Sequence, residues 1–122
     1  MHALVVDDSR PIRRIESEIL TELGFQTRDA CNGRQALDRL QEGPLPGVIL
    51  VDWNMPEMDG LEFIRSVRKE ARFSGVAILM VTTETETDQM LRALSAGADE
   101  YLMKPFQKEG LVDKLRLLGV VS

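Results

Sequence analysis

Residues 48–60 read Val-Ile-Leu-Val-Asp-Trp-Asn-Met-Pro-Glu-Met-Asp-Gly, and this stretch decides the fold. The first four residues are aliphatic without polar alternation, which predicts a strand buried on both faces, as in the middle of a parallel sheet. Pro56 marks a loop, and Asp59 with Glu62 has the pattern of a capping box that begins a helix. Asp52 is therefore predicted at the carboxyl end of a core strand, where open α/β sheets bind ligands. Taken alone, it could equally be an ordinary strand-ending aspartate.

Composition and charge narrow the class of protein. A chain of 122 residues, 43% of them hydrophobic and 29% charged, predicts one globular domain over residues 1–122. The net charge of −5 argues against a nucleic-acid partner, which would require a basic surface. No apolar stretch is long enough to span a membrane, so we expect no membrane association. A single cysteine, Cys31, cannot form an internal disulfide, which fits a reducing cytoplasm.

The N-terminal segment repeats the pattern of an apolar strand that ends in carboxylates. Residues 3–6 are apolar and are followed by Asp7 and Asp8. Pro11 in a first turn and Gly24 after a last turn then bound a predicted helix. Helical spacing predicts one apolar face and one polar face on this helix. The apolar face contains Ile12, Ile15, Ile19, Leu20 and Leu23, and the polar face contains Arg13, Arg14, Glu16, Glu18 and Glu22.

The rest of the chain continues an alternation of strands and helices. Further strands are predicted at residues 25–30, 76–81 and 101–103, and helices around residues 36–40, 61–67, 90–94 and 111–118. In the helix around 90–94, Met90, Leu91 and Leu94 share the apolar face. Five alternations of this kind predict an α/β fold with a mostly parallel sheet and helices on both faces.

Four of the apolar strands end in a polar group, namely Asp7-Asp8, Asp52, Thr82 and Lys104. The carboxyl ends of parallel strands share one edge of the sheet, so these groups should meet in one crevice. Three carboxylates and a loop carbonyl offer the hard oxygen ligands that Mg²⁺ prefers. With a mobile lysine and a hydroxyl beside them, the predicted chemistry is phosphoryl transfer onto a carboxylate.

This ordered set resembles the receiver domains of two-component response regulators over essentially the whole chain. Asp52–Pro56, Met58–Gly60 and Tyr101–Phe106 are most similar to the chemotaxis (CheY-like) subgroup. The resemblance implies a flavodoxin-like, doubly wound sheet of five parallel strands in the order 2-1-3-4-5.

The resemblance also implies roles for the residues of the crevice. Asp52 would accept a phosphoryl group from the phosphohistidine of a sensor histidine kinase. Asp8, Asp52 and the Asn54 carbonyl would bind Mg²⁺, with Asp7 acting partly through water. Thr82 and Lys104 would bind the phosphoryl oxygens.

Further residues would transmit the signal and set its lifetime. Tyr101 would change rotamer as Thr82 moves, and Asn54 and Glu84 would tune the lifetime of the phosphorylated state. Such a protein would be a monomeric, stand-alone regulator that contacts an unknown output protein through the face around Tyr101. It would assist its own phosphorylation without being a classical enzyme.

Three alternatives remain open. The chain has Glu84, Glu86 and Asp88 where motor-binding regulators often carry lysines, so the output partner could be the flagellar motor or another protein, as in a phosphorelay adaptor. A phosphohydrolase with an aspartyl-phosphate intermediate would place a second acid two residues after Asp52, where this chain has Asn54. The intact residue set argues against a module that never takes up phosphate.

Overall fold

The computed structural model describes residues 1–122, in which five strands and five α-helices alternate along the chain. No helix combines the length and the apolar character needed to cross a bilayer. The elements are β1 (His2–Val6), α1 (Arg10–Glu22), β2 (Gln26–Ala30), α2 (Gly33–Glu42), β3 (Val48–Val51), α3 (Gly60–Arg68), a 3₁₀ turn (Ala71–Phe73), β4 (Ala77–Thr82), α4 (Thr87–Ala96), β5 (Glu100–Met103) and α5 (Lys108–Leu117).

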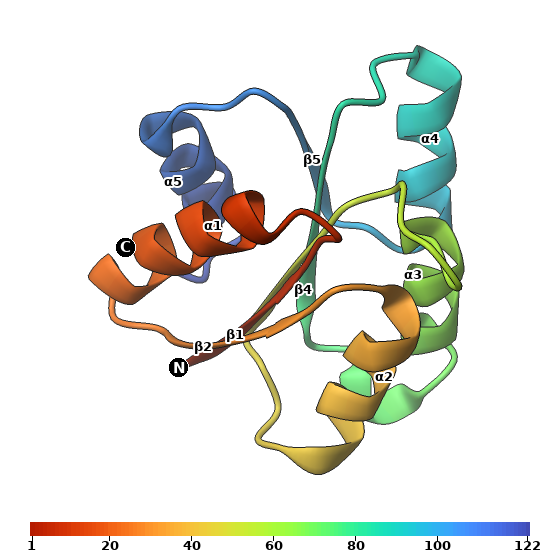
Figure 1. Ribbon diagram of the computed structural model, residues 1–122, viewed down its shortest axis with the longest axis horizontal. Coiled ribbons are helices and arrows are strands. Elements are labelled where there is room, and N and C mark those ends of the chain that lie inside the picture. The colour runs from red at the N-terminus through yellow and green to blue at the C-terminus, as the bar shows by residue number, and fades with distance from the viewer.

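The five strands form one parallel sheet in the order β2-β1-β3-β4-β5 (Figure 1), which confirms the predicted topology. β3 lies in the middle and pairs with β1 on one side and β4 on the other. All four of its residues are buried, as expected for a strand that is covered on both faces. Because every pair is parallel, the carboxyl ends of β1, β3, β4 and β5 open at the same edge.

Helices cover both faces of the sheet and create two separate cores. α1 and α5 lie on one face, and α2, α3 and α4 lie on the other (Figure 1). Alternate residues of β3 face opposite ways, so Leu50 packs in the core under α1 and α5, and Ile49 in the core under the other three helices. The doubly wound architecture is therefore confirmed.

The structure corrects the predicted faces of α1. Glu16, which we assigned to the polar face, is only 1% exposed, and Ile15, assigned to the apolar face, is 47% exposed. Ile19 and Leu20 are buried as predicted. The core-facing stripe therefore runs from the half-buried Ile12 through Glu16 to Leu20, with spacings of four residues, as helix geometry requires. The carboxyl of Glu16 occupies a position that an aliphatic side chain would ordinarily fill.

The apolar face predicted for α4 is largely in contact with solvent. Leu91 and Leu94 are 56% and 42% exposed, whereas Ala93 is fully buried and Met90 is partly buried against the core. The small side chain of Ala93 allows the helix to approach the core closely on that side. The two leucines are left on the outer surface of α4.

The start of α3 is held tightly against the end of β3. The predicted capping box is confirmed, since the Asp59 carboxylate accepts a hydrogen bond from the N–H of Glu62, and the Glu62 carboxylate accepts one from the N–H of Asp59. The N–H of Gly60 donates to the carbonyl of Trp53 at 2.8 Å. A Cβ atom on Gly60 would lie only 2.1 Å from the backbone carbonyl oxygen of Asp52. Only glycine fits here without moving the strand end that carries Asp52.

Gly60→Ala should therefore lower the free energy of unfolding by about 3 kcal/mol, near the upper end for overpacking, because the obstructing atom belongs to the backbone. Gly110→Ala in α5 is the matched control, because its Cβ would meet only a Leu102 methyl at 3.8 Å and alanine favours a helix. Urea titrations of both variants decide the matter. Equal stability of the Gly60 variant and wild type would contradict the close packing.

Candidate functional site

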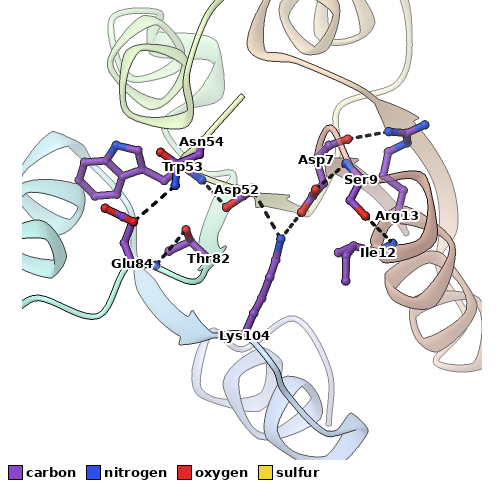
Figure 2. Close-up of polar contacts among 10 residues, drawn as sticks. All are labelled: Asp7, Ser9, Ile12, Arg13, Asp52, Trp53, Asn54, Thr82, Glu84 and Lys104. Atoms are coloured by element: carbon purple, nitrogen blue, oxygen red, sulfur yellow. Dashed lines mark hydrogen bonds and ion pairs between the residues drawn. The ribbon is translucent and has the colours of Figure 1, made fainter. Parts of the chain in front are cut away.

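The predicted site residues from β1, β3 and β5 meet at the carboxyl edge of the sheet (Figure 2). Asp7 and Asp8 follow β1, Asp52 follows β3 and Lys104 follows β5. Carboxylate oxygens of the three aspartates all lie within 4.8 Å of one another. Asp7 and Asp52 are buried, and Asp8 is exposed at the mouth of the cluster. The alternating strand ends therefore assemble one acidic cluster, as the sequence predicted.

Lys104 joins two carboxylates of this acidic cluster. Its Nζ donates to Asp7 Oδ2 at 2.6 Å and lies 3.4 Å from Asp52 Oδ2 (Figure 2). Burial alone would lower the pKa of this ammonium group, but the hydrogen bond that it donates to Asp7 and the charge of Asp52 raise the pKa above its usual value. Lys104 is therefore a permanent cation that offsets part of the negative charge.

Asp7 is held by groups that sequence analysis did not identify. Its Oδ1 accepts a hydrogen bond from the N–H of Ser9 at 2.8 Å, and its backbone carbonyl accepts one from Arg13 Nη1 at 2.7 Å. Burial raises the pKa of Asp7 above its ordinary value, although Lys104 and the Ser9 N–H oppose that rise. Arg13 was placed on the polar face of its helix, but no sequence signal indicated that it would reach the end of β1.

Asp52 presents its two oxygens to different partners. Oδ1 accepts a hydrogen bond from the N–H of Trp53 at 2.7 Å, and Oδ2 faces Lys104. The ring of Trp53 is only 7% exposed, and the guanidinium carbon of Arg92 in α4 lies 5.8 Å from its centroid. Trp53 is therefore almost completely buried next to Asp52.

Thr82, Glu84 and Tyr101 form a second group beside the acidic cluster. The hydroxyl of Thr82 accepts a hydrogen bond from the N–H of Glu84 at 3.4 Å, and the Tyr101 hydroxyl donates to the Glu84 carbonyl at 2.6 Å. Glu84 Oε2 also accepts from Asn54 Nδ2 at 3.5 Å. Burial, together with the charges of Glu84 and Asp52, raises the pKa of Tyr101 to about 12, so its phenol stays neutral. The segment after β4 thus connects the loop after β3 to β5.

The donor set of the acidic cluster fits a hard divalent cation. Three carboxylates with only one counter-ion leave a net negative charge, and a cation among them would relieve their mutual repulsion. Oxygen ligands with an exposed member leave room for the water molecules that Mg²⁺ retains. A carboxylate nucleophile, a permanent cation and such a metal are the components that phosphoryl transfer requires.

The sequence matches a family model described as the response regulator receiver domain over residues 3–116. It is 40% identical to chemotaxis protein CheY1 of Helicobacter pylori over 119 residues, covering 97% of this chain and 96% of that protein. It is 43% identical to a chemotaxis protein CheY homolog of Campylobacter jejuni, covering 100% of this chain and 95% of that protein.

Solved structures agree with these relatives. The chemotaxis response regulator CheY4 of Vibrio cholerae superimposes with a TM-score of 0.90 at 38% identity, covering 96% of this chain and 97% of that one. A putative response regulator from Chloroflexus aurantiacus gives a TM-score of 0.89 at 28% identity, with coverage of 96% and 95%.

Proposed function

The chain belongs to the response regulator receiver family, and from that premise we propose that Asp52 is its phosphoryl acceptor. The donor in a two-component system is the phosphohistidine of a sensor histidine kinase. The observation that carries the assignment is the geometry around Lys104, whose Nζ lies 2.6 Å from Asp7 and 3.4 Å from Asp52 at the ends of different strands. No fold requirement brings a lysine and two buried carboxylates together, whereas transfer of a phosphoryl group onto a carboxylate uses the positive charges of a lysine and of a metal bound by carboxylates.

Receiver domains bind Mg²⁺ at an acidic pocket, and we assign that role here to the acidic cluster. Asp8 and Asp52 would ligate the cation directly, together with the backbone carbonyl of Asn54, and Asp7 would act partly through water. When bound, the metal supplies positive charge that neutralises the carboxylates and the incoming phosphoryl group. The acidic cluster needs this additional positive charge, because Lys104 is the one cation within ion-pair distance of Asp7 or Asp52.

Side chains of the protein carry out the remaining steps of phosphoryl transfer. A carboxylate oxygen of Asp52 forms a bond to the phosphorus as the P–N bond to the kinase histidine breaks, and the histidine leaves as neutral imidazole after taking up a proton from solvent. The backbone N–H of Trp53 holds Oδ1 of Asp52. Lys104 moves from Asp52 onto the new phosphoryl oxygens, and the Thr82 hydroxyl donates to another of them. None of these proposed roles is the hydrolysis of a small phosphate ester. The position two residues after Asp52 is Asn54, and a phosphohydrolase is not favoured.

Transmission of the signal is proposed to run through Thr82, Glu84 and Tyr101. If Thr82 turns toward a phosphoryl oxygen, the N–H of Glu84 loses its acceptor, and the Glu84 carbonyl that holds Tyr101 is free to shift. Two-state rearrangements of this kind need a coupling of only about 1–3 kcal/mol. Tyr101 would then change rotamer, and Asn54 and Glu84, which already contact each other, would set the lifetime of the phosphorylated state.

We propose that the phosphorylated protein acts in chemotaxis-type signalling and contacts its output protein through the face around Tyr101. The similarity to CheY proteins supports this pathway. Glu84, Glu86 and Asp88 at the start of α4 make that part of the face acidic, so a basic surface would suit the output protein. We propose that residues 1–122 act as one monomeric receiver unit.

The direct test is transfer of a phosphoryl group from a set of autophosphorylated histidine kinases of the same organism. We expect rapid labelling by one kinase or very few, and dependence on Mg²⁺. The same protein should also accept a phosphoryl group from acetyl phosphate, more slowly. Failure of every phosphohistidine and small-molecule donor to label the protein in Mg²⁺ would refute the proposed function.

The fluorescence emission of Trp53 should report the binding of Mg²⁺ and of a phosphoryl mimic. The ring is buried and its backbone N–H contacts Asp52, so neutralising the nearby carboxylates changes the local field that the ring experiences. We expect a change on adding Mg²⁺ and a second change on adding beryllium fluoride, a phosphoryl mimic. The second change should require Mg²⁺ and should vanish in Asp52→Ala. A mimic response without a divalent metal or without Asp52 would place the chemistry on another residue.

A further inference from the structure

Glu16 is an acidic side chain buried in the core with no partner for its charge. The residue is 1% exposed, and its Oε1 is the only buried side-chain oxygen or nitrogen that lacks a hydrogen-bond partner. It lies in the middle of α1, on the face that packs against the sheet, and it is not one of the residues expected to bind a metal or phosphate. Such a group is costly to bury and needs a physical explanation.

Three charged groups at the acidic cluster act on Glu16. Asp7 at the end of β1 and Asp52 at the end of β3 disfavour a negative charge on Glu16, whereas Lys104 after β5 favours one. The first lysine of α5, Lys108, is already paired with Glu22 near the end of α1, and β4 contributes only the aliphatic Leu79 and Val81 to the core under α1 and α5. The two carboxylates and burial together outweigh Lys104 and raise the pKa of Glu16 to about 8.

A divalent cation in the acidic cluster would reverse this balance. It would neutralise Asp7 and Asp52, which now oppose ionisation of Glu16, and would add positive charge on the same side of the carboxyl. The pKa of Glu16 should then fall toward its ordinary range. A proton that is stable on Glu16 in the absence of the metal would no longer be stable in its presence.

We propose that Glu16 is a proton-carrying positioning residue of the metal site, which holds a proton in the metal-free protein and releases it to solvent when a divalent cation binds Asp7, Asp8 and Asp52. Release of the proton leaves Glu16 as a carboxylate, whose negative charge Lys104 and the metal would offset. This inference rests on the proposed function, because it requires that the acidic cluster bind a cation.

The link between proton and metal is reciprocal. If binding the metal expels a proton, a higher proton concentration must weaken binding of the metal by the same factor. Affinity for Mg²⁺ should therefore increase as the pH rises toward about 8 and should level off above it. Phosphorylation, which depends on the metal, would follow the same dependence, so that Glu16 makes this regulator sensitive to pH near neutrality.

The test is a Mg²⁺ titration, followed by Trp53 emission, at about pH 6.5 and about pH 9, on either side of the Glu16 pKa. Wild type should bind Mg²⁺ at least about fivefold more tightly at the higher pH. Glu16→Gln, which keeps the shape of the protonated side chain, should bind with one affinity at both. Glu18→Gln, at an exposed position of the same helix, should behave as wild type.

Calorimetry supplies a second readout that needs no variant. Mg²⁺ binding to wild type at about pH 7.5 should release a measurable fraction of one proton, seen as a binding heat that depends on the ionisation heat of the buffer. Absence of Mg²⁺ binding at either pH would refute the proposed metal site itself. Binding without proton release, or an equal pH dependence in wild type and Glu16→Gln, would refute the role of Glu16 and leave the metal site intact.

Discussion

Asp52→Asn protein should acquire a phosphoryl group from acetyl phosphate at least about a thousandfold more slowly than wild type. An amide oxygen is too weak a nucleophile for this transfer, and no other carboxylate occupies the same position relative to Lys104 and the Trp53 N–H. The amide keeps the shape of the side chain and can still accept the Trp53 hydrogen bond, so the fold should survive. Intact-mass spectrometry after incubation with donor and Mg²⁺ measures the loss.

Asp38→Asn is the matched control for this substitution. Asp38 is an exposed aspartate on α2, away from the ends of the strands, so its replacement should leave labelling at the wild-type level. Labelling of the Asp52 variant at an appreciable rate would show that a neighbouring side chain, such as Asp7 or Asp8, accepts the phosphoryl group.

Glu16→Leu should stabilise the metal-free protein strongly at alkaline pH. The folded state raises the pKa of Glu16 from 4.5 to about 8, so the unfolded chain loses this proton at lower pH than the native protein does. The native state therefore loses stability relative to the unfolded state as the pH rises from about 4.5 to about 8. At about 1.4 kcal/mol for each pH unit, the upper limit of this loss is about 5 kcal/mol above pH 8.

Leucine removes this titration and fills a similar volume in the core. The two proteins should have free energies of unfolding that differ little near pH 4.5 and diverge steadily up to about pH 8 in chelator. Urea denaturation at a series of pH values measures the divergence. Glu18→Leu controls for adding a leucine to α1. Parallel curves for wild type and Glu16→Leu would mean that Glu16 holds no proton in the native state.

The sequence predicted the sheet and the acidic cluster for the same reason. Runs such as Val48–Val51 lack polar alternation, and each ends at the polar residue that the site needs, so strand ends and site residues were found together. Parallel pairing then requires those ends to lie at one edge. The exact contacts of Lys104 with Asp7 and Asp52 could not be predicted, because they depend on side-chain rotamers at the ends of separate strands.

The two helix faces show where residue type misled the prediction. On α1, the spacing from Ile12 to Leu20 placed position 16 inside the apolar stripe, but the charge of glutamate argued for solvent. On α4, the size of Leu91 argued for burial, while the packing distance favoured Ala93. In both helices the geometry of packing outweighed the type of residue. A residue that breaks its own helical stripe is therefore a signal for a strained or functional position.

The tight fit of Gly60 has a mechanical consequence. One side of Asp52 is braced, since the first turn of α3 presses against the Asp52 backbone and leaves no space for even a methyl group. Thr82, Glu84 and Asn54 are instead connected by two long hydrogen bonds, 3.4 Å from the N–H of Glu84 to the Thr82 hydroxyl and 3.5 Å from the Asn54 side chain to the Glu84 carboxylate. A displacement of Asp52 is therefore resisted by the first turn of α3, whereas the long hydrogen bonds among Thr82, Glu84 and Asn54 break more easily. The difference in stiffness between these two sets of contacts thus determines the direction in which a structural change at Asp52 is transmitted.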